Sequence, residues 1–509
     1  MRTTLATTLL LVLWATACAQ DKCWIYLKDK PAVAAGARFV SEQAVQNRAL
    51  LGLQRHQYTD TPLNEEYLEQ LRGLGVQLVC SSRWLNAVSA YVDDNQMRLL
   101  KQLTFVTGIQ PIYLHSHPAS AAGQDPDPNY ALAQINAGVL KEQQLTARGV
   151  RIGVIDGSFF TAPHSPGLQD IFATGRVGGT KDFVAKSSTK FFDNTDNLQD
   201  IHGTAVWHMI GGYDHTSDVQ YGLATGATFF LARTDDTDKE FLGEEDYWVA
   251  GLEWLDSLGV RLVNSSLGYN FFDNAEDNHR LSEMTGQAIA SSKAAQIAAE
   301  QKGMIIVVAA GNYGKIKNWR VVAAPADARD VISVGATDSY GLKLPLSSIG
   351  SELVAFTKPD VACFSSSGTS ISAPVITGLI ACLLEKDPAL NMPQIKGLLA
   401  RAGNLYPYAN NYLGYGIPDA GKMLKLLSLP ADSALNAGEE KKVSGKIFRM
   451  PVERSASAKG VLFHKKDERI VSEQLSIRLN KGKIRIRKPG TVSRSTLVLP
   501  GKMVEIIWE

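Results

Sequence analysis

Ser370 lies in a run of small residues, SSSGTSISAPVITGLIACLL (365–384), which leads directly into an apolar helical pattern with Pro374 in its first turn. Serine and threonine hydroxyls commonly cap the free N–H groups at a helix start, and proline is tolerated there. One interpretation of the run is therefore helix capping. The other is that Ser370 is a nucleophile, because a helix amino terminus supplies oriented N–H groups that stabilise a developing oxyanion.

Three further polar residues could complete a catalytic site. A serine hydroxyl is a weak nucleophile until a histidine accepts its proton, and that histidine needs a carboxylate to hold its tautomer. Asp156 ends the apolar run VRIGVI, His202 opens the helical pattern HGTAVWHMIGG, and Asn312 follows the apolar run MIIVVAAG. The amide of Asn312 could donate a hydrogen bond to an oxyanion. Together with Ser370, these residue types predict acyl transfer by an Asp, His and Ser triad.

These residues can meet only if a sheet gathers segments that are far apart in the sequence. Continuous apolar strands are predicted at 150–155, 260–264 and 304–310, with an Ala-rich helix over 287–301. Such strands separated by helices favour a parallel sheet covered on both faces. Because ligands bind beyond the carboxyl ends of parallel strands, we expect the four polar residues on one rim of this sheet.

The motifs around these residues resemble the signature blocks of the subtilisin-like serine proteases. They stand in the family's order as VIDGS (154–158), HGT (202–204), AAGN (309–312) and GTSISAP (368–374). Secondary blocks agree, among them YGLATGATFFLAR, NSSLG, ADARDVISVGATD, KPDVA and GYGIPDA. The resemblance covers about residues 130–430. It implies a subtilisin-like α/β fold and a serine endopeptidase acting on protein or peptide substrates, with Asp156, His202 and Ser370 as the triad and Asn312 as the oxyanion donor.

The same resemblance nominates residues that line the substrate cleft. Their small side chains would let a peptide backbone approach closely, and packing within the sheet is an equal alternative. These residues are Ser266, Leu267, Gly268, Ala309, Ala310 and Gly311.

Each polar residue also has a structural interpretation. Asp156 could cap the next helix, His202 could be a surface histidine, and Asn312 could be a turn residue, because Asn tolerates left-handed backbone. His208 is expected to serve packing or the surface. The chain departs from the family pattern at Ala205, where many relatives have a second histidine.

No cofactor is predicted. The acidic loop that contains Asp193, Asp196 and Asp200 is a candidate for calcium, but its default interpretation is a solvated loop.

The region before the catalytic blocks has a different pattern. Strand-like runs at 23–27, 76–80 and 87–92 alternate with helical patterns at 65–74 and 95–102, which indicates a compact α+β unit. Residues 84–112 resemble the family's inhibitory propeptide, so the resemblance implies an inactive precursor that carries its own intramolecular inhibitor. The following stretch, HSHPASAAGQDPDPN (115–129), has the composition of an exposed linker where proteases cut.

Residues 1–19 have the basic start, short apolar core and small residues of a secretory signal peptide. An exported soluble protein is favoured. A lipoprotein is the minority interpretation, in which cleavage before Cys18 leaves that cysteine lipidated and the protein on a membrane. Cys23 and Cys80 lie in one region and could pair, whereas Cys363 and Cys382 are expected to be separate buried thiols.

The chain of 509 residues is too long for one core, and a net charge of +1 does not suggest a nucleic-acid partner. From about Leu435 short alternating runs predict a small antiparallel β domain of unknown role. Its excess of Lys and Arg indicates a solvated surface, with attachment to an anionic surface as the second interpretation. We therefore expect a signal peptide (1–19), an α+β inhibitory domain (20–120), a catalytic domain (121–430) and a C-terminal β domain (435–509).

The preferred hypothesis is an exported endopeptidase made as an inactive zymogen. Two others remain. A non-catalytic binding module could use the same scaffold, and an acyl-enzyme could pass its acyl group to an amine instead of water. Casein digestion distinguishes an endopeptidase from a non-catalytic binding module. The masses of the products distinguish hydrolysis from ligation.

Overall fold

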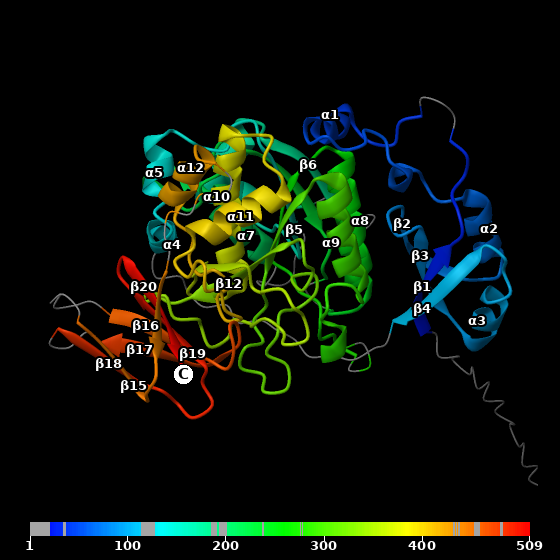
Figure 1. Cartoon of the computed structure of the whole chain (residues 1–509). Coiled ribbons are helices and arrows are strands. Elements are labelled where there is room, and N and C mark those ends of the chain that lie inside the picture. The colour runs from blue at the N-terminus through cyan, green and yellow to red at the C-terminus, as the bar shows by residue number, and fades with distance from the viewer. Residues whose placement is uncertain are drawn as a thin grey trace, which may run out of the picture.

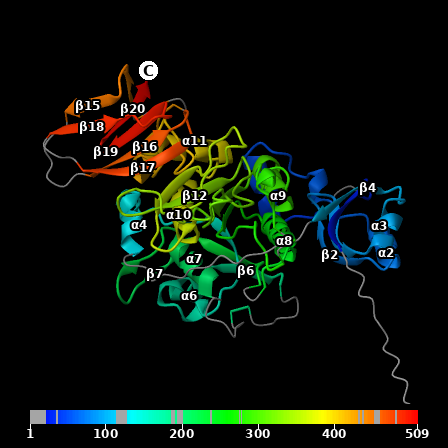
Figure 2. The same ribbon diagram turned by 90° about the horizontal axis from the view of Figure 1, so that it is seen from below.

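The computed structural model describes residues 21–33, 37–112, 128–184, 191–192, 201–236, 239–274, 276, 278–430, 433, 435, 438–451, 459–478 and 482–509. The predicted signal peptide with Cys18, most of the predicted linker and the acidic loop with Asp193, Asp196 and Asp200 lie outside these residues. Three bodies follow one another along the chain, and the N-terminal and C-terminal units lie on opposite sides of the central one (Figures 1 and 2).

The N-terminal unit (residues 21–112) contains a four-stranded antiparallel sheet in the order β2-β3-β1-β4, packed against two helices. The side chain of Asn64 caps the first helix, and Asp93 and Gln96 form a capping box at the second. The predicted α+β unit is thus confirmed. Its elements are β1 (Asp21–Leu27), α2 (Glu65–Gly73), β2 (Gln77–Ser82), β3 (Ala87–Val92), α3 (Asp94–Leu100) and β4 (Val106–Ile112).

The prediction that Cys23 and Cys80 could pair is wrong. Cys23 on β1 lies opposite Ala90, and Cys80 on β2 lies opposite Ser89, so strand β3 separates the two cysteines. Two strand spacings of about 4.8 Å each exceed the Cα separation that a disulfide normally bridges. All four cysteines in the described part of the chain are free, and Cys363 and Cys382 are buried thiols as expected.

A segment between β1 and α2 leaves this unit and lies on the central one. It contains α1 (Glu42–Leu50) and the 3₁₀ turn η1 (Tyr58–Asp60), and we call residues 41–61 the arm. The arm contacts the ends of α8 (Gly243–Ser257) and α9 (Ala290–Lys302). The amide of Ser41 donates to the carbonyl of Ser257 at 2.8 Å, and Asn47 donates to the carbonyl of Gly259 at 2.8 Å. In Figure 1, α1 accordingly stands apart from α2 and α3.

The central unit (residues 128–430) contains a seven-stranded sheet in the order β13-β12-β11-β10-β5-β9-β6. Every neighbouring pair is parallel, as the continuous apolar strands predicted. The strands are β5 (Arg151–Asp156), β6 (Val177–Asp182), β9 (Thr228–Arg233), β10 (Leu262–Ser265), β11 (Ile305–Ala309), β12 (Ile332–Thr337) and β13 (Val361–Phe364). A short hairpin pairs β7 (Tyr213–Asp214) with β8 (Val219–Gln220).

Helices cover both faces of this sheet, which confirms the predicted architecture. One face packs against α8 and α9, and the other packs against the remaining helices of the unit (Figure 1). The predicted helix at 287–301 begins slightly later, at Ala290. The other helices are α4 (Pro128–Gln134), α5 (Gly138–Glu142), α6 (Gln169–Ala173), α7 (His202–Gly211), α10 (Thr369–Lys386), α11 (Met392–Ala402) and α12 (Ala420–Leu427), with 3₁₀ turns η2 (Ala162–His164), η3 (Pro166–Leu168) and η5 (Leu281–Glu283).

Helix α10 is the central core helix on its face of the sheet. Among the described residues it is the one helix long and apolar enough to cross a membrane, but 78% of that stretch is buried inside the protein. Its apolar residues pack around the sheet and against α7. The apolar character that follows Ser370 in the sequence therefore has a packing cause.

The C-terminal unit (residues 438–509) is a five-stranded sheet in the order β14-β20-β19-β16-β17, and a ribbon of two strands, β15 and β18, packs on it. The predicted antiparallel arrangement holds except for β14 and β20, which pair in parallel. These two strands are not joined by a hairpin, so no short turn dictates an antiparallel direction. The strands are β14 (Glu439–Val443), β15 (Ile447–Pro451), β16 (Lys459–Lys465), β17 (Val471–Arg478), β18 (Lys483–Arg487), β19 (Arg494–Leu499) and β20 (Lys502–Trp508).

Candidate active site

Asp156 is the last residue of β5 and is completely buried. Its Oδ1 accepts a hydrogen bond from the amide of Gly157 at 2.9 Å and lies 2.7 Å from Nδ1 of His202. Its Oδ2 has no hydrogen-bond partner among the described residues. The position does not fit the helix-capping alternative, because the carboxylate contacts the imidazole of His202 at the rim of the sheet.

His202 is the first residue of α7, and about 40% of its side chain is exposed. Burial of the rest disfavours the charged imidazole, but the nearby carboxylate of Asp156 outweighs this effect, so the pKa of His202 is raised above its usual value. The contact through Nδ1 leaves Nε2 as the ring atom that is free to face a reactant. His202 is therefore not a plain surface histidine.

Ser370 is the second residue of α10 and does not cap this helix. The residue that precedes the helix is Gly368, which supplies no side-chain cap. The hydroxyl of Ser370 donates instead to the carbonyl oxygen of Ser266 at 3.3 Å, and the hydroxyl of Ser266 donates to the carbonyl of Ser370 at 2.8 Å. A contact of 3.3 Å is long for an O–H donor, so the Ser370 hydroxyl is weakly held and free to rotate.

Asn312 supplies the cap that the helix start requires. Its Oδ1 accepts hydrogen bonds from the amide of Thr369 at 3.0 Å and from the hydroxyl of Thr369 at 3.1 Å. The same hydroxyl accepts a hydrogen bond from the amide of Gly311 at 3.0 Å. The left-handed residue of this turn is Gly311, with φ of 101°, so the prediction that Asn312 could be the left-handed turn residue is wrong. With Oδ1 engaged, Nδ2 of Asn312 remains as a donor near Gly368, at the start of α10.

The nominated cleft residues follow two neighbouring strands of the sheet. Ser266, Leu267 and Gly268 come directly after β10, and Ala309, Ala310 and Gly311 end and follow β11. The side chains of Ala309 and Ala310 are buried in the two cores on either side of the sheet, which favours packing as their side-chain role. Leu267, Gly268 and Gly311 are half-buried and lie at the accessible edge.

Sequence reasoning missed Thr369 and Asp235. Asp235 follows β9, the strand beside β5, and accepts a hydrogen bond from the hydroxyl of Tyr269 at 2.8 Å. After burial and Asp156, its carboxyl also acts on the pKa of His202. Asp235 could have been found from the sequence. Polar residues beyond the carboxyl ends of parallel strands are site candidates, and Asp235 has this position relative to β9.

His208 packs against its surroundings, as expected. Its Nε2 lies 3.1 Å from the hydroxyl of Ser165, and burial lowers its pKa to about 4. Ala205 lines a cavity of about 240 Å³ beside the first turns of α7. The small side chain of Ala205 contributes to this space next to His202.

Within the described part of the chain, no group of three or more His, Cys, Asp or Glu residues could hold a metal ion. The calcium candidates Asp193, Asp196 and Asp200 lie outside the described residues.

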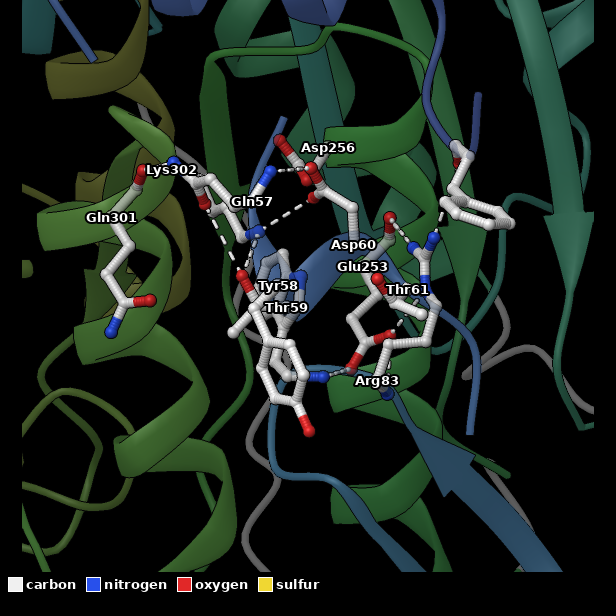
Figure 3. A network of polar contacts seen from close by, with 12 residues as sticks. Gln57, Tyr58, Thr59, Asp60, Thr61, Arg83, Glu253, Asp256, Gln301 and Lys302 are labelled. Carbon is white, nitrogen blue, oxygen red and sulfur yellow. Dashed lines mark hydrogen bonds and ion pairs between the residues drawn. The ribbon is translucent and has the colours of Figure 1, made fainter. Parts of the chain in front are cut away.

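Buried charges join the arm of the N-terminal unit to the central unit, and Figure 3 shows several of them. Arg48 contacts Asp60 at 2.6 Å and Asp256 at 2.8 Å, and Lys302 contacts Asp60 at 2.8 Å. All four side chains are at most 5% exposed. Because each cation faces a carboxylate, the cost of burying the charges is offset by their attraction.

Two more carboxylates of α8 form ion pairs and hydrogen bonds with residues of the N-terminal unit. Glu253 contacts Nε of Arg83 at 3.2 Å (Figure 3). It also accepts a hydrogen bond from the hydroxyl of Ser82 at 2.6 Å. Asp246 lies 2.6 Å from Nζ of Lys22, and both side chains are almost fully buried. The surface of α8 and α9 is therefore complementary in charge to residues 21–112.

Two family models match this chain. The model of the subtilase family matches residues 147–416, which include all four polar residues of the rim. The model of the peptidase S8 propeptide domain of Bacteroidota matches residues 22–125. The second match covers the N-terminal unit that rests on α8 and α9.

Individual relatives agree with the family models. Subtilisin NAT of Bacillus subtilis subsp. natto is 25% identical over 343 residues, which cover 66% of this chain and 79% of that protein. Subtilisin DY of Bacillus licheniformis is 28% identical over 279 residues, which cover 53% of this chain and 89% of that protein. A crystal structure of the epidermin leader peptide processing serine protease of Staphylococcus aureus shares the fold, with a TM-score of 0.52 and 15% identity over 80% of this chain and all of that one.

Proposed function

Because this chain belongs to the subtilase family of serine proteases, we propose that it cleaves peptide bonds through an acyl-enzyme on Ser370. His202 accepts the proton of the Ser370 hydroxyl as that oxygen attacks the peptide carbonyl carbon. The protonated His202 then gives the proton to the leaving amine, and a water activated by the same imidazole releases the acyl group. Asp156 holds the imidazole in the productive tautomer.

The observation that carries the proposal is the 2.7 Å contact between Oδ1 of Asp156 and Nδ1 of His202. A buried carboxylate at this nitrogen orients Nε2 outward and stabilises the imidazolium that forms during catalysis. The Ser370 hydroxyl has only a 3.3 Å contact with Ser266 to exchange for a hydrogen bond to His202. Such catalytic contacts commonly tighten only when substrate binds.

The oxyanion site follows from the cap on α10. Asn312 uses its Oδ1 on Thr369, so its Nδ2 and the amide of Ser370 are the two donors for the carbonyl oxygen as it gains charge. Donors fixed before the reaction need little reorganisation, and one such donor contributes about 3–4 kcal/mol to transition-state stabilisation. Ser266 to Gly268 and Ala309 to Gly311 would hold the substrate backbone on either side of this site.

The N-terminal unit is the intramolecular inhibitor in this proposal, and it makes the precursor a zymogen. Its support is the propeptide match at residues 22–125 together with the complementary charges on α8 and α9. Cleavage falls in the linker predicted at residues 115–129. We propose export through residues 1–19, which have the pattern of a secretory signal peptide, with lipidation of Cys18 as the alternative. The mass of the mature N terminus tests the cleavage and the lipid together.

A fluorophosphonate probe tests the nucleophile. Processed protein should carry one label on Ser370, and the Ser370→Ala variant should lose about 10⁶-fold in turnover of a peptide substrate. A processed protein that digests casein equally well with Ser370→Ala would exclude the proposal.

The pH profile tests the pairing of His202 with Asp156. Since His202 must be neutral to accept a proton and its pKa is raised, activity should fall with decreasing pH at a midpoint above the ordinary value of about 6.5. Asp156→Asn should move this midpoint to lower pH and reduce kcat by about 10⁴-fold. Asp235→Asn should move it in the same direction by a smaller amount. Equal midpoints in all three proteins would contradict the assignment.

A further inference from the structure

The ribbon of the C-terminal unit presents two chemically opposite faces. Phe448, Ile484 and Ile486 point inward and are buried in the core of the five-stranded sheet. The alternate residues point outward and are exposed. These outward residues are Arg449 on β15 and Lys483, Arg485 and Arg487 on β18, and we call them the cationic face. Because the inward side chains anchor the ribbon, the four cations are displayed from a fixed backbone.

Like charges face each other across this ribbon. Arg449 lies directly opposite Arg485 in the strand register, and Arg487 and Lys483 follow on the same side. Lys446 and Lys488 extend the charge beyond one end, where the amide of Lys488 donates to the carbonyl of Lys446. Like charges directly opposite one another destabilise a strand pair. The fold thus carries an arrangement that stability alone does not favour.

Several other cations of the C-terminal unit have a counter-charge, unlike the cationic face in the described part of the chain. Lys441, Lys465 and Arg494 each contact a glutamate. Within the described residues, none of the four cations of the face contacts a carboxylate. The sequence from 482 to 504 contains no Asp or Glu at all. With a net charge of only +1 for the chain, this face is a local concentration of positive charge.

We propose that the cationic face binds the phosphate groups of an anionic lipid surface. Guanidinium groups form paired hydrogen bonds with phosphate oxygens, and three of the four cations are arginines. Three of the cations stand in one row along β18, about 7 Å apart, and Arg449 stands about 5 Å across the ribbon from the middle one, so all four can reach the same surface. Ile447 and Pro451 share the outward side, so apolar groups lie beside the cations as at a membrane interface.

This binding does not depend on Ser370 and persists after the N-terminal unit is lost. The C-terminal unit contacts the central one through a buried apolar cluster that includes Leu405, Leu413 and Phe463. The mature protease would therefore act next to the lipid surface that holds it.

Co-sedimentation of the full-length Ser370→Ala chain with vesicles tests the proposal. The protein should bind vesicles that contain phosphatidylglycerol and not vesicles of phosphatidylcholine alone, and binding should weaken as salt is raised. The double variant Arg449→Gln with Arg485→Gln should bind about 30-fold more weakly, because each basic residue near an anionic surface contributes about a fivefold factor.

A matched control removes the same charge elsewhere. Lys315 and Lys317 are two neighbouring exposed lysines of the central unit, and Lys315→Gln with Lys317→Gln should leave vesicle binding unchanged. The ribbon variant should unfold at the same temperature as the parent or higher, since it relieves opposed like charges. The proposal is overturned by absent binding to phosphatidylglycerol, by an equal loss in ribbon variant and control, or by binding to soluble heparin in preference to vesicles.

Discussion

The N-terminal and C-terminal units both rest on the central unit, but by different chemistry. The N-terminal unit adds buried ion pairs, such as Arg48 with Asp256 and Lys302 with Asp60, to the apolar contacts of Trp24 and Trp84. The C-terminal unit uses an apolar cluster, in which Val461 and Phe463 pack with Leu405. The two interfaces thus differ in the polarity of the surface that separation would expose to water.

Separation has opposite consequences at the two interfaces. Ionised side chains such as Asp256 and Lys302 would regain hydration if the N-terminal unit left, although the apolar contacts of Trp24 and Trp84 would be lost. An exposed apolar cluster loses its burial and promotes association with other chains. The comparison predicts that loss of the N-terminal unit would expose a more polar surface than loss of the C-terminal unit.

The largest effect is expected at the apolar interface. Phe463→Ala removes a side chain that is 1% exposed and should lower the free energy of unfolding by about 3–5 kcal/mol. Residues 435–509 should then be cut more readily by added trypsin, and urea unfolding measures the energy. Phe463→Leu is the control and should cost less. An unchanged unfolding curve for Phe463→Ala would mean that this cluster does not hold the C-terminal unit.

A somewhat smaller effect is expected at the ion pairs of the arm. Arg48→Met leaves Asp256 without its cation, while Asp60 keeps Lys302, so the cost should be near the lower end of the range for broken buried pairs, about 3 kcal/mol. In Ser370→Ala protein whose linker has been cut, size-exclusion chromatography should show earlier loss of the N-terminal unit.

Arg72→Met is the matched control for the arm. Its ion pair with Glu65 is more than half exposed, so the substitution should change retention of the N-terminal unit by less than about 1 kcal/mol. If the Arg48 and Arg72 variants retained the N-terminal unit equally well, the ion pairs of the arm would not contribute to its attachment.

Among the contacts between the units, the smallest effect is expected at Arg83. Its side chain is 21% exposed, and Glu253 keeps its hydrogen bonds from Ser82 and the amide of Trp84 when Arg83 is replaced. Arg83→Met should therefore weaken retention by about 1 kcal/mol, measured on the same cut protein. A loss as large as that of the Arg48 variant would show that the sheet, and not the arm, carries the attachment.

The rim of the central sheet was largely predictable from the sequence. Asp156 ends one apolar strand and Asn312 follows another, and the carboxyl ends of parallel strands meet at one edge. The ends of apolar strands can be located from the local sequence. Once the parallel sheet was predicted correctly, the contact of Asp156 with His202 could be expected. The roles of Ser370 and Asn312 as nucleophile and oxyanion donor stay predictions.

The arm could not be predicted. Arg48 and Asp256 are separated by 208 positions, and nothing in a run of charged residues specifies which distant carboxylate it will meet. The same reason explains the error at Cys23 and Cys80, where two cysteines in one region lie on strands separated by a third. The parallel pairing of β14 with β20 likewise joins the two ends of the C-terminal unit.

The sequence by itself determined the family, the alternation of strands and helices and the identity of the groups at the rim, because these depend on residue type and on spacing along the chain. The tertiary structure alone decided that Asn312 caps α10 through Thr369, that the arm lies on α8 and α9, and that the ribbon turns its arginines outward. These features depend on contacts between segments that are distant in sequence. Such contacts are selected by the packing of the whole molecule.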